Sequence, residues 1–313
     1  MSLPSFKVGV DGGGTKTELI LVDAAGSVVA THLAPGCNPS QVGPAKARAI
    51  VSEGLHALCS KYPAGSVQRT LFCMAGSPQF WREYGDTLTG FGRVDTAPDS
   101  VPVLELATGG APGLVLHAGT GSFVAARAPD GTVRYAGGLG WKLGDAGSGF
   151  DLGRRAIAVA LLELQGWPAG GAAALSPLAS ALQTHTGLAD YAANSRFFYH
   201  DAAANASISS FAPRVLELAE RNCGPAQQAV ADSVTDLARL ADQVIHQLFF
   251  APTSPVPCGV SGRILNSIPA AFALRSLAGK LRWPVTLNFL TTSPSEGVRR
   301  LLAKPATEGG DLK

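Results

Sequence analysis

Two glycine-rich turns, each set between two β-rich runs, constrain the fold of this chain more than any other feature. The first joins residues 8–10 to residues 17–22 through the motif Asp11-Gly-Gly-Gly-Thr-Lys16. The second repeats the plan within residues 113–126, around Gly119-Thr-Gly-Ser122. A further turn and a third β-rich run follow each copy, over residues 23–30 and 128–135. Two β-meanders of similar length predict two related halves with a cleft between them.

The first turn has the composition of a phosphate-binding loop. Glycine lets backbone N–H groups approach phosphate oxygens because no Cβ intervenes. We therefore assign phosphate contacts to Gly13, Gly14, Thr15 and Lys16, of which the last two add a hydroxyl donor and a cation. Asp11 lies at the strand end, where its carboxylate suits a hydrated Mg²⁺. The P-loop and the dinucleotide fingerprint both open a helix, whereas this turn joins strands. A tight surface hairpin is the alternative interpretation.

The second turn strengthens the nucleotide interpretation, because one loop alone could be an ordinary hairpin. We assign Gly119, Thr120 and Gly121 to the phosphates of the same nucleotide. The two hairpin loops would hold those phosphates from opposite sides of the expected cleft.

The composition limits the partners of the chain. With 313 residues, of which 46% are hydrophobic, the chain suggests two domains. The net charge is +2 and there is no basic run, so neither nucleic acid nor a membrane is expected as a partner. Five scattered cysteines show no Cys-x-x-Cys spacing, and no basic segment followed by an apolar run opens the chain. We therefore expect a cytoplasmic protein with a small-molecule substrate.

A third glycine-rich block follows the two turns, Gly144-Asp145-Ala-Gly-Ser-Gly149. Together, the three motifs resemble those of the BadF/BadG/BcrA/BcrD ATPase family. The resemblance is to its N-acetylglucosamine kinase-like branch, in the actin-like sugar-kinase superfamily. The resemblance covers nearly the whole chain. It implies an α/β, two-domain actin-like ATPase fold, related to ribonuclease H, with duplicated β-meander/α halves and an interdomain cleft. We place the domains at residues 1–117 and 118–313. The resemblance also implies that a terminal helix, residues 294–304, packs back on the first domain.

The resemblance implies an ATP-dependent hexosamine kinase that transfers the γ-phosphate to the 6-hydroxyl of N-acetylglucosamine, with ATP and Mg²⁺ as cofactors. Its base is an Asp that opens a helix shortly before the second turn. Asp99 fits this place, and Asp95 is the runner-up; Asp86 and Glu105 are the other acidic residues nearby. An Asp at a helix start is also what ordinary capping produces.

The resemblance further assigns the sugar and adenosine contacts. The expected sugar-binding residues are Asn38, Asp99, Thr120, Gly138 and Asp145. Asp145 is equally placed to cap the helix expected near Ser148, and Asn38 precedes a proline, as turn formers do. The expected adenosine loop is Gly259, Val260 and Gly262, although Cys258 replaces a usual first glycine.

Three residues depart from the branch near the expected sugar site: Phe123, Leu139 and Ala146. They put N-acetyl recognition in doubt, so glucosamine or another hexosamine stays open. A second hypothesis is an ATPase activator of an acyl-CoA dehydratase or reductase, which requires cysteines that hold an iron–sulfur cluster. A third is a sugar-sensing regulator. Whether the chain forms a homodimer is left open.

The remaining pattern predicts further elements. Helices are expected at residues 45–62, 78–91, 103–108, 148–165, 171–185, 211–222, 225–250, 268–281 and 294–303. Further strands are expected at 68–75, 256–260 and 285–290.

Overall fold

The chain builds two five-stranded sheets with the same strand order. The strands of the first are β1 (Phe6–Gly12), β2 (Lys16–Val22), β3 (Val28–Pro35), β4 (Val67–Met74) and β5 (Arg93–Pro98). Those of the second are β6 (Gly113–Ala118), β7 (Ser122–Arg127), β8 (Val133–Gly137), β9 (Val256–Ser261) and β10 (Val285–Phe289). The order is β3-β2-β1-β4-β5 in one sheet and β8-β7-β6-β9-β10 in the other.

The pairing directions repeat as well. The central strand, β1 or β6, is antiparallel to the strand that follows it and parallel to one that arrives much later, β4 or β9. The duplication predicted from the two glycine-rich turns is therefore present in the topology.

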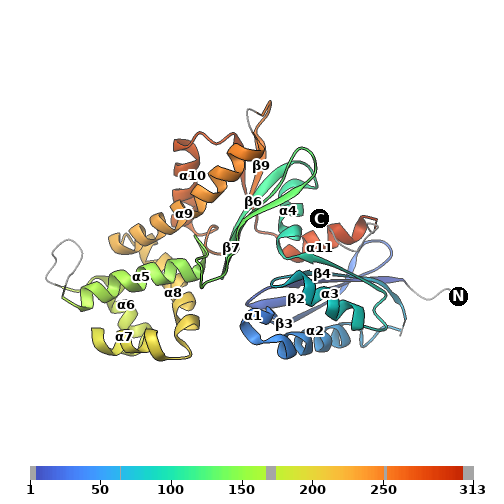
Figure 1. Cartoon of the computed structure of the whole chain (residues 1–313), viewed down its shortest axis with the longest axis horizontal. Coiled ribbons are helices and arrows are strands. Elements are labelled where there is room, and N and C mark those ends of the chain that lie inside the picture. The colour runs from blue at the N-terminus through green and yellow to red at the C-terminus, as the bar shows by residue number, and fades with distance from the viewer. Residues whose placement is uncertain (1–4, 64, 167–173, 250–251, 306–313) are drawn as a thin grey trace. The chain divides into compact units, whose positions relative to one another are not determined.

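The computed structural model describes residues 5–63, 65–166, 174–249 and 252–305, and the chain divides into two units (Figure 1). Unit 1 comprises residues 1–111, 130–133 and 291–313; unit 2 comprises residues 112–129 and 134–290. The main division thus falls a few residues before the boundary placed at 117/118, and the chain returns to unit 1 at Thr291.

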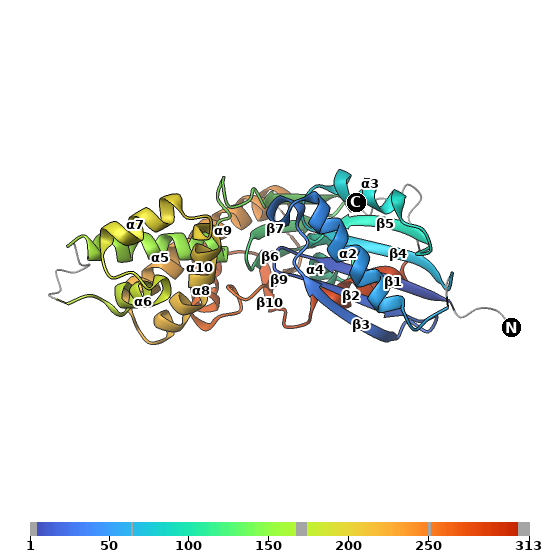
Figure 2. The same cartoon turned by 90° about the horizontal axis from the view of Figure 1, so that it is seen from below.

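Unit 1 has helices on both faces of its sheet. One face carries α2 (Pro44–Cys59) and α3 (Pro78–Thr87), whose apolar side chains share a core with β1, β2 and β4. The opposite face carries α4 (Ser100–Thr108) and α11 (Pro294–Ala303), which form a second core with β2, β4 and β5. The short α1 (Pro39–Val42) precedes α2, which lies along the sheet in Figure 2.

Helix α11 packs directly on α4 and β1. The contact is close because Gly297 has no side chain: a Cβ there would lie 2.2 Å from the carbonyl oxygen of Pro102. The last helix therefore completes the unit that the first 111 residues begin.

Unit 2 adds a helical group to its sheet. Its helices are α5 (Gly149–Leu164), α6 (Pro177–Thr186), α7 (Tyr191–His200), α8 (Ala204–Glu220), α9 (Gly224–Leu248) and α10 (Ile268–Lys280). A single hydrophobic core joins most of them to β6, β7 and β9. Of the helices that the structure describes, none combines the length and the apolar character needed to cross a membrane.

Besides the four-residue helix α1, two elements escaped the sequence-based prediction. Strand β5 contains Asp95, a residue type that strands disfavour, and the ion pairs that make its burial tolerable involve Arg69 on another strand. Helix α7 has one buried residue, Asn194, so its pattern carries no apolar stripe. In addition, α8 begins at Ala204, seven residues earlier than expected. The helix expected at 171–185 is α6, and the start of that expected range lies outside the described residues.

Candidate active site

The first glycine-rich turn is a tight hairpin loop between β1 and β2. The N–H of Gly13 donates to the Lys16 carbonyl at 2.9 Å. From the end of β3, the N–H groups of Gly36 and Cys37 donate to the carbonyls of Thr15 and Gly13, both at 3.1 Å. The loop backbone is thus fixed on two sides, while the Thr15 and Lys16 side chains are exposed. Of the predicted phosphate contacts, residues 13–15 form this loop and Lys16 is the first residue of β2.

A row of side chains crosses the first sheet next to this loop. Asp11 is paired in register with Glu18 on β2 and with Cys73 on β4. Residues directly opposite one another on neighbouring strands point to the same face of the sheet. Cys73 is in turn opposite Ala97, two residues before Asp99. Asp11 and the start of α4 are therefore brought to the same edge of the sheet, where the parallel strands end.

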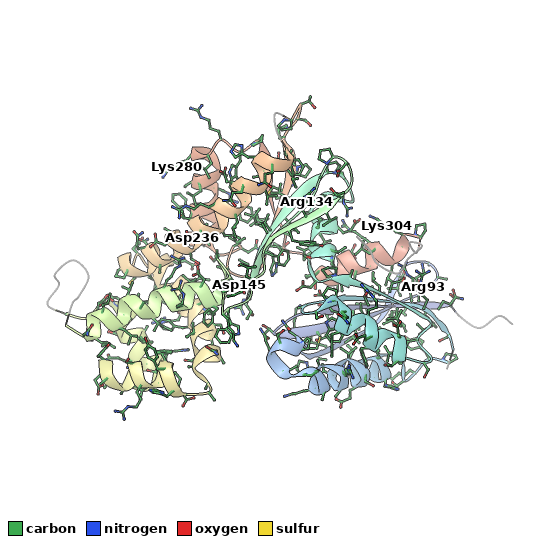
Figure 3. All side chains as sticks on the ribbon, in the orientation of Figure 1. Arg93, Arg134, Asp145, Asp236, Lys280 and Lys304 are labelled. Carbon is green, nitrogen blue, oxygen red and sulfur yellow. The ribbon has the colours of Figure 1, made fainter. Side chains whose placement is uncertain are left out.

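Of the four acidic residues considered for the base, only Asp99 combines partial burial with the lack of a cation partner among the described residues. The two oxygens of Asp95 accept from Arg69 Nε and Arg93 Nε, each at 2.7 Å. Glu105 is paired with Lys304 Nζ at 2.7 Å, and Asp86 is exposed on α3. Figure 3 shows Arg93 and Lys304 in unit 1.

Asp99 lies at the start of α4, as predicted, but its side chain makes no capping hydrogen bond to the helix. The residue follows β5 directly and is partly buried. The ordinary capping role therefore does not account for it.

Burial raises the pKa of both carboxyl groups at this edge. The pKa of Asp11 rises to about 7, chiefly through burial and then through the nearby charges of Asp99 and Glu18, while Lys16 lowers it. The pKa of Asp99 rises to about 6 through burial, against the lowering effect of its own N–H and that of Ser100. Titration near neutrality is characteristic of catalytic acids and bases.

Asn38 lies at the same edge of unit 1. Its Oδ1 accepts from the Ser40 N–H at 3.0 Å and so caps the short α1. Gly76, just after β4, is close by, because a Cβ there would lie 3.1 Å from that oxygen. The side-chain nitrogen of Asn38 has no hydrogen-bond partner within the described residues, so it could donate to a substrate hydroxyl or carbonyl.

The second glycine-rich turn is a shorter hairpin loop between β6 and β7. The N–H of Gly119 donates to the Gly121 carbonyl at 2.9 Å, and the Gly119 carbonyl accepts from the N–H of Gly149 at 2.8 Å. The first residue of α5 is thereby attached to the loop, and Thr120 is exposed at its tip. The three predicted phosphate residues of this half lie together.

Asp145 is buried directly beside the second loop (Figure 3). Its Oδ1 accepts from the Gly140 N–H at 2.9 Å, and a Cβ on Gly121 would lie 3.3 Å from its Oδ2. Burial raises its pKa, against the lowering effect of the Gly140 N–H. Gly138 is tied to the same loop, because its N–H donates to the Ser122 carbonyl at 3.0 Å. The helix cap is Ser148, which leaves Asp145 available for a substrate.

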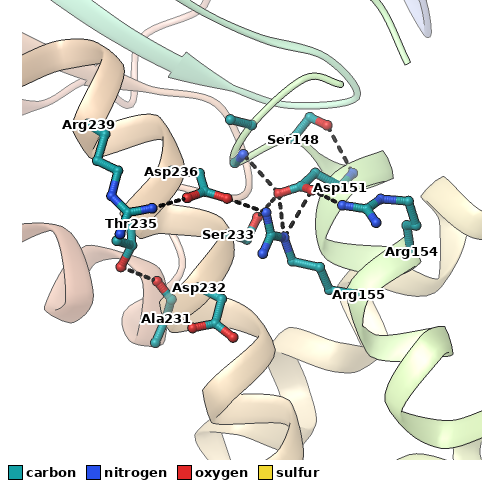
Figure 4. A network of polar contacts seen from close by, with 12 residues as sticks. Ser148, Asp151, Arg154, Arg155, Ala231, Asp232, Ser233, Thr235, Asp236 and Arg239 are labelled. Atoms are coloured by element: carbon teal, nitrogen blue, oxygen red, sulfur yellow. Dashed lines mark hydrogen bonds and ion pairs between the residues drawn. The ribbon is translucent and has the colours of Figure 1, made fainter. Parts of the chain in front are cut away.

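A polar network fixes the start of α5 (Figure 4). Ser148 Oγ accepts from the Asp151 N–H at 3.1 Å, and Asp151 Oδ2 accepts from Ser233 Oγ on α9 at 2.8 Å. Arg155 bonds both oxygens of Asp151 at 3.0 Å and also pairs with Asp236 on α9. The block that carries Asp145 is therefore anchored to two helices.

The three residues assigned to adenosine have different surroundings. Gly259 and Val260 lie inside β9, where they pair with β6 on one side and β10 on the other. Gly262 lies in the turn after β9, with φ +92°, and a Cβ there would be 2.1 Å from the Ala118 carbonyl oxygen. Only glycine fits this contact, which packs the turn against the base of the second loop. Adenosine binding by these residues stays a prediction.

The three departures from the branch also have defined surroundings. The Phe123 ring stacks on His117, with ring centroids 4.9 Å apart. Leu139 is 62% exposed, and the carbonyl of Ala146 accepts from Ser122 Oγ at 2.7 Å. The backbone of Ala146 thus bonds the residue that follows the second loop, whereas the apolar side chain of Leu139 is exposed to solvent.

Contacts between distant segments could not be foreseen from the sequence. Glu18 accepts from Ser293 Oγ and Ser295 Oγ, both at 2.8 Å, and from Lys16 Nζ at 3.2 Å. Two serines among many give no signal of this role. His117 is a residue of strand β6 and lies beside the second loop.

The chain is similar to several known proteins. A stretch of 170 residues is 29% identical to the N-acetyl-D-glucosamine kinase of Dictyostelium discoideum, covering 47% of this chain. The match spans about half, 51%, of that curated relative. A provisionally assigned N-acetylglucosamine kinase from Chromobacterium violaceum has a solved structure that is 28% identical, with a TM-score of 0.75 and coverage of 95% of this chain and 99% of that one.

Two further solved structures share the fold. A provisionally assigned N-acetylglucosamine kinase from Porphyromonas gingivalis is 23% identical, with a TM-score of 0.73 and coverage of 94% and 97%. A ROK family glucokinase from Streptomyces griseus, solved with glucose and AMPPNP, is 16% identical, with a TM-score of 0.57 and coverage of 95% and 97%. They confirm the predicted α/β actin-like ATPase fold with duplicated halves.

A family model matches residues 8–275, which include both glycine-rich hairpins, Asp99 and the anchored Asp145 block. With these elements in place on the duplicated sheets, the chain belongs to the BadF/BadG/BcrA/BcrD ATPase family.

Proposed function

We propose that the chain is an ATP-dependent hexosamine kinase that transfers the γ-phosphate of ATP to the 6-hydroxyl of N-acetylglucosamine. The observation that carries the proposal is the environment of Asp99. Its carboxyl group is partly buried, has no cation partner among the described residues, and lies at the sheet edge that carries the first phosphate loop. The N-acetylglucosamine kinase assignments of relatives in Dictyostelium discoideum and Chromobacterium violaceum support the same reaction.

Asp99 would act as the general base. The O6 oxygen of the sugar attacks the γ-phosphorus while the bond to the β–γ bridging oxygen breaks, and ADP leaves. The proton of the hydroxyl goes to Asp99. With a pKa of about 6, this carboxyl is mostly ionised at neutral pH and still basic enough to accept a proton. Proper positioning supplies most of the rate enhancement in such transfers.

The two loops would bind the phosphates. Backbone N–H groups of Gly14 and Gly121 and the side chains of residues 15, 16 and 120 are the proposed donors. Gly13 and Gly119, whose N–H groups bond within their own loops, would let the phosphates approach closely because they lack a Cβ. Gly259, Val260 and Gly262 keep their proposed role toward adenosine.

Asp11 is the proposed Mg²⁺ residue. A buried carboxyl at the end of a strand suits a hard cation, because the cation restores the ionised form that burial disfavours. Within the residues that the structure describes, no group of three His, Cys, Asp or Glu side chains could hold a metal, so a bound Mg²⁺ would depend mainly on phosphate oxygens and water. Such an ion neutralises the charge that develops on the phosphates.

Asp145, Asn38, Gly138 and Thr120 are proposed to bind the sugar together with Asp99. The Oδ2 of Asp145, which has no hydrogen-bond partner among the described residues, can accept a sugar hydroxyl in a charge-assisted hydrogen bond. Glucosamine is the alternative acceptor, because Phe123 and Leu139 replace residues of the branch beside this site. The expected cytoplasmic location also stays a prediction.

The surroundings of the five cysteines, all of which the structure describes, do not favour the iron–sulfur activator. Four of the five cysteines, Cys37, Cys73, Cys223 and Cys258, are buried, and Cys59 is half-buried at the end of α2. A cluster shared between two subunits needs cysteines at the surface.

A coupled assay of ADP release over a sugar panel tests the proposal. We expect N-acetylglucosamine or glucosamine to stimulate ADP release strongly, and glucose to do so weakly. If no amino sugar in the panel stimulates ADP release, the protein is not a hexosamine kinase. Mass and NMR analysis of the product would identify the phosphorylated hydroxyl.

A further inference from the structure

His117 lies in a row of side chains that crosses the second sheet at the base of the second loop. In register it is opposite Phe123 on β7 and Ser261 on β9. The three side chains therefore point to the same face of the sheet. Phe123 follows the second loop directly, and Ser261 precedes the turn at Gly262.

The imidazole of His117 is held in one orientation. Its plane stacks on the Phe123 ring at an interplanar angle of 16°, with centroids 4.9 Å apart. Its Nδ1 is 3.3 Å from Ser261 Oγ, within hydrogen-bond distance. Stacking fixes the plane of the ring, and the hydrogen bond fixes its rotation within that plane.

This orientation turns the other ring nitrogen toward the phosphate loop. A Cβ on Gly119 would lie 3.3 Å from His117 Nε2 and 3.9 Å from Cε1. Within the described residues, Nε2 has no hydrogen-bond partner, although the side chain is half-buried. A ring nitrogen that is held in one orientation beside such a loop, with no partner among the described residues, is placed to bind a ligand atom.

The duplicated topology gives a second, independent reason. Asp11 is the next-to-last residue of β1, and His117 is the next-to-last residue of β6. Both strands are central in their sheets, and both lead into a glycine-rich loop. His117 therefore occupies in unit 2 the position that Asp11 occupies in unit 1.

We propose that His117 is a phosphate-binding residue, which donates a hydrogen bond from Nε2–H to a phosphate oxygen of the nucleotide held by residues 119–121. In this tautomer, Nδ1 accepts from the Ser261 hydroxyl. Burial lowers the pKa of His117 to about 4, so the donor is a neutral imidazole near pH 7. The inference rests on the proposed nucleotide site and adds to it a residue and a tautomer.

Calorimetric titration with ATP, ADP and adenosine in the presence of Mg²⁺ tests the proposal without any need for turnover. His117→Phe keeps an aromatic ring against Phe123 but lacks the donor. We expect its Kd for ATP to rise about tenfold, since a hydrogen bond to a charged group is lost, while its Kd for adenosine is unchanged. His117→Gln, which retains an N–H donor, should recover most of the lost affinity. His246→Gln, at an exposed histidine of α9, is the matched control.

Ser261→Ala provides a second variant in case His117→Phe does not fold. It removes the hydroxyl that fixes the tautomer, so ATP affinity should fall by a smaller factor and adenosine affinity should not change. Equal losses for ATP and adenosine, or an unchanged ATP affinity in both variants, would show that His117 is only a packed strand residue. If the wild-type protein binds none of the three ligands, the proposed function fails and this inference fails with it. ATP binding that both variants leave unchanged would overturn the role of His117 alone.

Discussion

Gly297 of α11 and Pro102 of α4 are in backbone contact, with the glycine Cα placed so that a Cβ would be 2.2 Å from the proline carbonyl oxygen. Pro102 lies in the first turn of α4, three residues after Asp99. Gly297→Ala must therefore push apart two backbones, at a cost of about 1 to 3 kcal/mol in the free energy of unfolding. Urea denaturation measures this cost. Gly279→Ala, on α10, is the control, because a Cβ there meets nothing within 4 Å; an equal loss in both variants would contradict the packing argument.

Asp99→Asn removes the proposed base while it keeps the size of the side chain. We expect kcat to fall by about 10²- to 10⁴-fold, with ATP affinity largely intact. Steady-state kinetics and ATP titration measure the two effects. Asp86→Asn, on the exposed side of α3, should change neither. A near-normal kcat in Asp99→Asn would refute the assignment.

The pH dependence of activity should follow the carboxyl group of Asp99. A base works only when deprotonated, and its pKa is about 6, so kcat/KM should fall as the pH drops through about 6. Asp11, with a pKa of about 7, interacts electrostatically with Asp99. The fall in kcat/KM at low pH therefore reflects the coupled titration of both carboxyl groups. A rate profile that stays flat down to about pH 5 would argue against a raised pKa.

Activity should fall as the pH drops, whereas the contribution of Asp11 to the free energy of unfolding should fall as the pH rises. Because the folded-state pKa of Asp11 is raised from 3.8 to about 7, the folded state holds its proton more tightly than the unfolded state. Its contribution to stability is complete below about pH 4 and is lost as the pH rises through about 7. Asp11→Asn should therefore raise the free energy of unfolding at about pH 8, by about 1 to 3 kcal/mol, and gain little at about pH 4. The same variant should lose Mg²⁺-dependent ATP binding. A variant less stable than the wild type at the higher pH would contradict the burial argument.

Lys304 and Glu105 form an ion pair that joins the C-terminal end of α11 to α4. Lys304→Ala leaves the buried carboxylate of Glu105 without its partner, so we expect a loss of about 1 to 3 kcal/mol in stability. Thermal or urea unfolding measures it, with Lys280→Ala, at an exposed lysine of α10, for comparison. Because Glu105 lies six residues beyond Asp99, kcat should change far less than in Asp99→Asn.

The glycine-rich turns allowed the duplicated meanders to be predicted because period-two alternation and glycine punctuation are local signals. Asp99 and the Asp145 block were singled out by the family resemblance instead, because the local pattern placed the helix after Asp99 only at residues 103–108. Strand β5 could not be predicted from local signals, since the burial of Asp95 depends in part on an ion pair with Arg69, on a neighbouring strand.

The choice between Asp95 and Asp99 also needed the structure. In sequence, the two residues are acids four positions apart, but the ion pairs that occupy Asp95 come from the strand it lies on and from its neighbour. His117 shows the same limit. Its orientation depends on Ser261, 144 residues away, and no spacing rule connects the two.

The placement of α11 has a consequence for how the chain folds during synthesis. Its residues Val298, Leu301 and Leu302 form one wall of a core whose other walls are made by β2, β4, β5 and α4. Those earlier elements leave the ribosome first, yet α11 follows them only after the whole of residues 134–290 has been made. Unit 2 lies between these segments and has its whole core available sooner. We therefore expect the unit that begins the chain to be the last to become resistant to protease as a nascent chain lengthens.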